Sequence, residues 1–236
     1  MERFFKYFEK YAKAMLIIGM VAAIIYAFYN TIGTYVFERM YFNNFKIPHG
    51  DMGVINSIQL YSTITDKINK VLYFLILLIP FSFVVKKEQK NFAAAKAVFV
   101  LILGFFALYV FYFIFDHRSA FGLPQDAFIT DLIYYGTLAL RETCYYGALF
   151  ATGFVLLKTP QKKLQRSVFF CAAPFAVLWF LRRFNVYYHI ANSITGNDVL
   201  AYYSVQTRIT HIIEVLFCVY LVALVAVLFL KRKVKP

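Results

Sequence analysis

The chain has 236 residues, of which 61% are hydrophobic and 20% aromatic, and its formal net charge is +13. A mean hydropathy of +0.63 is too high for an ordinary soluble domain of this length, so the sequence indicates an integral membrane protein. In a soluble protein such a charge would indicate nucleic-acid binding. Here the basic residues form short clusters between apolar runs, which is typical of membrane topology, and we expect no nucleic-acid partner.

Six segments are long and apolar enough to cross a hydrocarbon core, which needs roughly twenty helical residues. They lie at about 13–31, 70–86, 95–115, 131–157, 167–187 and 209–230. The first has no small-residue cleavage site and is expected to be a retained helix. The second contains Pro80 and follows the amphipathic run Met52–Lys70, which either lies at the interface or extends the helix. The expected fold is an all-α, six-helix membrane bundle that forms one polytopic domain over 1–236.

Four basic clusters hold sixteen of the 25 Lys and Arg residues and alternate with loops that are poor in them. The clusters are Arg3, Lys6, Lys10 and Lys13; Lys86, Lys87, Lys90 and Lys96; Lys158, Lys162, Lys163 and Arg166; and Lys231, Arg232, Lys233 and Lys235. The positive-inside rule then predicts a multi-pass plasma-membrane protein with both termini in the cytoplasm and the loops 32–69, 116–130 and 188–208 outside. The long first loop between helices 1 and 2 can fold over an outer site as a lid.

The segment 131–157 carries Arg141, Glu142 and Cys144 near its middle, where charges are expensive and are usually retained for function. At 1.5 Å per residue, Cys144 lies about 20 Å above the cytoplasmic end of its helix. Arg182 and Arg183 lie about 23 Å up, and His211 about 29 Å up. The three helices that carry these residues, 131–157, 167–187 and 209–230, therefore form the expected catalytic core, with its site toward the extracytoplasmic side.

The chemistry of these side chains fits acyl transfer. A buried thiol needs a base or a positive neighbour to become a thiolate nucleophile. His211 can accept that proton and return it to a leaving amine. Arg182 or Arg183 can hold an oxyanion, because a guanidinium stays charged in apolar surroundings. Of the other two cysteines, Cys171 is too near the inner face to take part, whereas the height of Cys218 does not exclude it.

Further ionisable residues are supporting candidates. Arg208 and Glu214 share one helical face with His211, at i−3 and i+3. Arg141 and Glu142 point about 100° apart on a helix, so each needs a partner elsewhere, and a structural polar network is the favoured role. Glu142 can also orient a catalytic side chain. His189 is the reserve base. The simpler role for Cys144 is packing, because Gly147 and Ala151 beside it form a small-xxx-small pair.

The order of these residues resembles the exosortase and archaeosortase transpeptidases over roughly Leu140 to the C-terminus. The matching features are Glu142-Thr143-Cys144 followed by Gly147, a basic cytoplasmic turn at 158–163, Pro174 with Arg182, and finally His211. The chain differs from the family at Tyr145 and Tyr146, where a small hydroxyl residue and then Gly usually follow the cysteine. It also has Trp179 three residues before Arg182, where the family usually has Asn.

The resemblance implies a membrane cysteine protease and transpeptidase that acts on surface proteins with a C-terminal sorting tail. Cys144 would attack the peptide bond beside the tail helix, with Arg182 or Arg183 and His211 assisting, and form a thioester. A lipid-linked amine or similar acceptor would resolve it. We expect no cofactor and no resident metal.

Two alternatives remain open. The first is a metal-dependent membrane hydrolase that uses external side chains, although none has HExxH spacing. Those side chains are His49, Asp51, Asp116, His117, His189 and His211. The second is a small six-helix transporter or channel with helices broken at Pro80 and Pro174.

Overall fold

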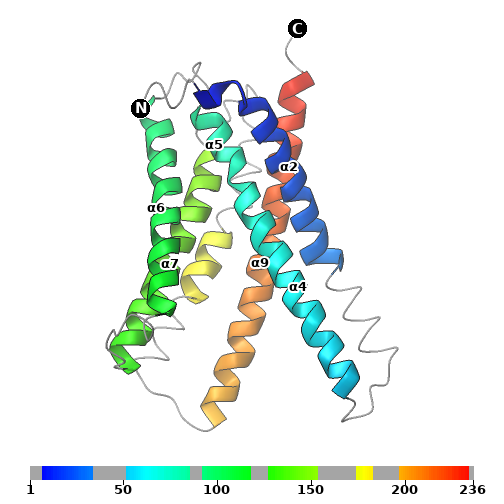
Figure 1. Cartoon of the computed structure of the whole chain (residues 1–236), viewed down its shortest axis with the longest axis vertical. Helices are drawn as coiled ribbons and strands as arrows, with labels where there is room; N and C mark the ends of the chain where they lie inside the picture. The colour runs from blue at the N-terminus through cyan, green and yellow to red at the C-terminus, as the bar shows by residue number, and fades with distance from the viewer. Residues whose placement is uncertain are drawn as a thin grey trace.

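A computed structural model describes residues 7–33, 52–85, 92–117, 127–153, 174–182 and 197–233, and these are helical or turn with no strand among them. The elements are α2 (Ala12–Phe28), the π-helical turn η1 (Tyr29–Gly33), α4 (Met52–Ile76), α5 (Leu78–Val84), α6 (Phe92–Asp116), α7 (Ala127–Ala151) and α9 (Asn197–Lys233). A short helical segment at 174–182, yellow in Figure 1, contacts α7 and α9 through the Phe175 ring. The start of α2, the end of α5, the start of α6 and the end of α9 lie at one end of the bundle (Figure 1).

Within the described ranges, four helices are long and apolar enough to cross a membrane. They span Ala12–Thr31, Thr63–Val84, Ala93–Phe115 and Arg208–Phe229, which correspond to the first, second, third and sixth expected segments. Helix α7 covers most of the fourth, 131–157, but Arg141, Glu142 and its tyrosines make it less apolar than those four. Only 174–182 of the fifth segment, 167–187, is described. The full count of six spans and the sides that the termini face stay predictions.

Two expected outer loops are partly helical. The amphipathic run Met52–Lys70 extends the second helix, because α4 is continuous from Met52 to Ile76. The last helix likewise begins at Asn197, well before the expected 209, so His211 lies inside a helix of 37 residues and does not open it. At 1.5 Å per residue α9 is about 55 Å long, which exceeds a hydrocarbon core of about 30 Å. The lid expected from the first loop falls largely on 34–51, outside the described residues.

The α4–α5 helix breaks at Leu77, three residues before Pro80, which lacks the N–H that a continuous helix would need. The Leu77 N–H donates to the Phe74 carbonyl at 3.1 Å, so the Tyr73 carbonyl loses its intrahelical donor. The Tyr145 hydroxyl of α7 donates to this carbonyl at 3.0 Å, and the two tyrosine rings stack with centroids 3.5 Å apart. An unpaired carbonyl at membrane depth costs several kcal/mol, so Tyr145 stabilises the break.

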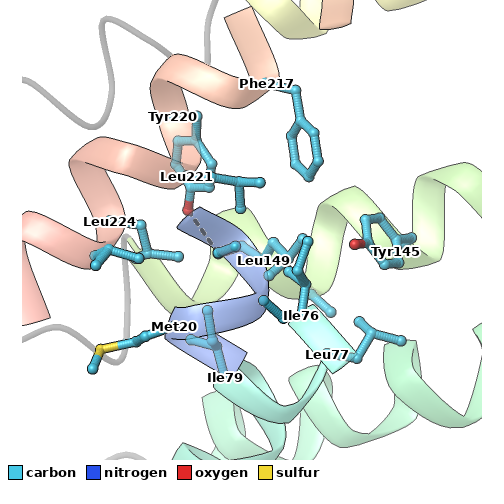
Figure 2. Close-up of a cluster of buried hydrophobic side chains, with 14 of the residues drawn as sticks. Met20, Ile76, Leu77, Ile79, Tyr145, Leu149, Phe217, Tyr220, Leu221 and Leu224 are labelled. Carbon is cyan, nitrogen blue, oxygen red and sulfur yellow. Dashed lines mark hydrogen bonds between the residues drawn. The ribbon is translucent and has the colours of Figure 1, made fainter. Parts of the chain in front are cut away.

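The core lies where α2, the α4–α5 break, α7 and α9 meet. Figure 2 shows Met20 of α2, Ile76 and Ile79 beside the break, Leu149 of α7 and Leu224 of α9 pointing toward one another. The Tyr220 hydroxyl of α9 donates to the Leu149 carbonyl at 2.7 Å, drawn as a dashed line in the figure. Tyr220, like Tyr145, therefore uses its hydroxyl to pair a backbone carbonyl of a neighbouring helix inside the bundle.

Near the other end of α2, neutral polar side chains join it to α4. Asn30 and Asn69 form a reciprocal amide pair, with nitrogen-to-oxygen distances of 3.2 and 3.3 Å. The hydroxyls of Tyr29 and Thr65 are hydrogen-bonded at 2.8 Å. We call these four residues the amide clasp. They hold the second half of α4 against η1 at the end of α2.

Gly19 of α2 lies directly against the α4–α5 break. A Cβ atom added there would lie 2.8 Å from the Ile79 Cγ1 atom and 3.0 Å from the Ile79 backbone nitrogen. Because the second of these is main chain, it cannot move without shifting the break. Only glycine lets α2 approach this closely.

We predict that Gly19→Ala destabilises the protein by about 1–3 kcal/mol, because the added methyl overpacks the contact between α2 and the break. The matched control is Gly147→Ala, where the added Cβ would lie 3.5 Å from a Leu101 side-chain carbon, an ordinary contact. That variant should be neutral or stabilised by up to about 1 kcal/mol, because alanine favours the helix. Equilibrium unfolding in mixed detergent micelles measures both, and equal effects would contradict the close approach at Gly19.

Candidate functional site

The Cys144 thiol lies in the contact between α7 and α6. A Cβ atom built on Gly104 of α6 would lie 3.2 Å from the Cys144 Sγ atom. One turn further along α7, Gly147 contacts the Leu101 side chain of the same helix. Cys144 and Gly147 therefore form a small-residue face that lets α6 and α7 pack closely, as the packing role of Cys144 requires.

Arg141 lies on this same α6-facing side of α7. Its guanidinium carbon is 4.7 Å from the centroid of the Tyr112 ring and 5.4 Å from that of Tyr109, both on α6. These distances are in the range of cation–π attraction, which is stronger when the cation is shielded from water. Arg141 thus pairs with aromatic faces of α6, which fits the structural role expected for it.

Glu142 and Tyr146 lie on a different side of α7. The Trp179 indole N–H of segment 174–182 donates to the Glu142 Oε2 atom at 2.9 Å. The Tyr146 ring packs edge-on against Phe175 and Phe217, with centroids 4.7 and 5.0 Å away. Residues two apart on a helix point about 200° from each other, so the Cys144 thiol and the Tyr146 ring face nearly opposite directions.

Arg182 lies on the Tyr146 side of α7, between α7 and α9. It lies within electrostatic range of Tyr146 and of Glu214 of α9. The Arg182 Nε atom is buried and has no hydrogen-bond partner among the described residues. A buried donor without a partner is costly and rare in a native structure. Arg182 therefore presents a guanidinium N–H that an oxyanion, carboxylate or carbonyl oxygen can satisfy.

His211 joins this group through Glu214. Its Nδ1 atom is 3.9 Å from the Glu214 Oε2 atom, and the two side chains are 68% and 48% exposed. Arg208, one turn before His211, is also exposed. We call six of these residues the Arg182 cluster. Its members are Glu142, Tyr146, Trp179, Arg182, His211 and Glu214.

The structure thus brings Arg182, His211, Glu142 and Glu214 into one cluster, while the Cys144 thiol and Arg141 face α6. Cys218 is buried and lies on α9 one turn after Glu214, so the two residues share a face of that helix. A carboxylate neighbour disfavours a thiolate, so this position suits packing better than nucleophilic chemistry. Arg183, His189 and Cys171 lie outside the described residues.

The side chains considered for a metal site are mostly not described. His49, Asp51 and His189 lie outside the described residues, whereas His117 ends α6 with its Nδ1 atom 2.9 Å from the Phe113 carbonyl oxygen. Within the described ranges, no group of three or more His, Cys, Asp and Glu side chains is placed to hold a metal ion.

Three residues of the site were not expected from the sequence. Trp179 was noted only as a departure from a family pattern, and Tyr145 and Tyr146 only as residues that intervene before Gly147. Their roles depend on the rotation of α7 about its axis, which its own sequence does not specify. The one available signal was the i, i+3 spacing of Trp179 and Arg182, which puts the indole and the guanidinium on one helical face.

The chain matches no protein-family model, no curated protein and no solved structure.

We predict that Arg141→Gln destabilises the α6–α7 pair by about 1–2 kcal/mol, because it removes a shielded cation from two tyrosine faces. Unfolding in mixed micelles of Arg141→Gln, Tyr112→Leu and the double variant measures the coupling. The two effects should be strongly non-additive, as expected for residues in contact. Additive effects would show that Arg141 is stabilised by other groups.

Proposed function

We propose that the chain is a membrane-embedded cysteine transpeptidase of the exosortase and archaeosortase type, acting at the outer side of the plasma membrane. Its substrates are membrane-anchored proteins with a C-terminal sorting tail, and its acceptor is a lipid-linked amine. The observation that carries the proposal is the buried Arg182 Nε atom, which has no partner among the described residues and lies between α7 and α9. A site built to stabilise a developing oxyanion needs such a donor held in place before the reaction.

Each side chain has one role in the proposed reaction. The Cys144 thiolate attacks the scissile carbonyl carbon, and the resulting oxyanion accepts a hydrogen bond from Arg182. The C–N bond then breaks as protonated His211 gives a proton to the leaving amine, which leaves a thioester at Cys144. The acceptor amine attacks the thioester, forms a new amide and releases the Cys144 thiol.

The contact of the Cys144 thiol with Gly104 constrains this reaction. Cys144 and the Arg182 cluster lie on different sides of α7, so the proposed attack requires the chain around Cys144 to rearrange locally as the substrate enters, while the Trp179–Glu142 hydrogen bond persists. Gly104 and Gly147 line the α6–α7 face at this point, so neither presents a side chain that blocks such a rearrangement.

The contact between Cys144 and Gly104 also favours a second function. If Cys144 only packs against Gly104, the Arg182 cluster is a binding site for a carboxylate or other anionic group in a small transporter. The α4–α5 break at Leu77 resembles the discontinuous helices that such proteins place at their substrate sites.

Alkylation of the full chain in lipid nanodiscs, followed by mass spectrometry across pH, separates the two functions. Under the transpeptidase proposal, a tailed substrate peptide makes Cys144 react at least about tenfold faster than Cys218 below pH 8, where an ordinary thiol is mostly protonated. Cys218, buried in the same molecule, is the internal control. The gain should disappear in His211→Ala and Arg182→Ala.

The contrary result is equally informative. A Cys144 that reacts no faster than Cys218 with or without the peptide would exclude the nucleophile. Binding of an anionic substrate that is then lost in Arg182→Ala would establish the transport function in its place.

A further inference from the structure

The position of Arg182 depends on a short element. The helical segment 174–182 has barely two and a half turns, too few to be stable without tertiary contacts. Phe175 near its start is buried against Tyr146, Phe150 and Phe217, which anchors one end. Arg182 is at the other end, and its Nε atom makes no hydrogen bond within the described chain. Something else must set the rotation of the segment near Arg182.

The Trp179 indole supplies that second anchor. Trp179 precedes Arg182 by three residues and so lies on the same helical face. Its Nε1–H donates to the Glu142 carboxylate of α7 at 2.9 Å. A hydrogen bond to a carboxylate is roughly twice as strong as a neutral one, and low dielectric surroundings strengthen it further. Together with Phe175, this bond fixes both the height and the rotation of the segment against α7.

We infer that Glu142 is a positioning residue, which acts through the Trp179 indole to hold the Arg182 guanidinium between α7 and α9. Glu142 thereby couples the helix that carries Cys144 to the segment that carries Arg182. The geometric part of this inference stands independently, and its role in transpeptidation rests on the proposed function.

The hydrogen bond itself has a direct reporter, because Trp179 is the only tryptophan in the chain. With ¹⁵N-labelled indole, the full chain in nanodiscs gives one indole N–H signal in NMR. Glu142→Leu should accelerate hydrogen exchange at this N–H about tenfold, whereas Glu142→Gln keeps an acceptor oxygen and should leave exchange within about threefold of wild type. Asp66→Asn, which changes an exposed carboxylate of α4, is the control. Unchanged exchange in Glu142→Leu would overturn the inference.

A distance between two spin labels measures the position of segment 174–182 without an enzymatic assay. Spin labels at the exposed positions Leu140 and Leu181, in a chain whose three native cysteines are replaced by serine, give the distance between α7 and the segment. Glu142→Leu and Trp179→Phe should broaden or shift this distance, and Glu142→Gln should restore the wild-type distribution. A distribution that is the same in all variants would overturn the positioning role, whether or not the chain is a transpeptidase.

The catalytic consequence is tested separately on a tailed substrate peptide. Glu142→Leu and Trp179→Phe should lower kcat about tenfold or more with KM changed less than about threefold, because binding of the tail does not use Arg182. Glu142→Gln should retain most of kcat. If wild type does not cleave the peptide, the proposed function fails while the spin-label result still decides the positioning role. If the distance changes and kcat does not, the positioning of Arg182 has no catalytic consequence.

Discussion

The structure depends on one constraint, which is that polar groups at membrane depth must find partners inside the bundle. The break at Leu77 frees the Tyr73 carbonyl, and the Tyr145 hydroxyl of another helix pairs it. Tyr220 does the same for the Leu149 carbonyl, and the Arg141 guanidinium lies over two tyrosine faces. These four tyrosines therefore share a use: their rings pack among apolar side chains while a hydroxyl or a ring face pairs a polar group. Among the described residues, the buried Nε atom of Arg182 departs from this pattern, because it has no hydrogen-bond partner there.

The two sides of helix α7 contact different parts of the protein. One side, with Arg141, Cys144 and Gly147, contacts α6. The other, with Glu142 and Tyr146, contacts the segment 174–182 and α9. Three adjacent polar positions, 141, 142 and 144, therefore belong to two separate environments.

The apolar helices could be predicted from the sequence, whereas the arrangement of the candidate site could be predicted only in part. The segments 13–31, 95–115 and 209–230 were predictable because hydropathy is a local property of the chain. The extension of α4 back to Met52 was open, since an amphipathic run is compatible with an interfacial helix or a longer span. The shared face of His211 and Glu214 was predictable from their i, i+3 spacing, and the similar heights of Arg182 and His211 placed both in the same half of the bundle. The orientation of Cys144 did not, because Gly104 and Leu101 of α6, some forty residues earlier in the chain, determine which side of α7 meets α6.

The amide clasp and the Arg182 cluster also differ in how an electric field acts on them. Asn30 and Asn69 carry no net charge, so neither pH nor the voltage across a membrane does appreciable work on their pairing. Each elementary charge that crosses 100 mV gains or loses about 2.3 kcal/mol, so the charged side chains at 182 and 214 are subject to that field. The junction of α2 with α4 is therefore insensitive to a transmembrane voltage. A displacement of segment 174–182 relative to α9 along the membrane normal, by contrast, would involve electrical work.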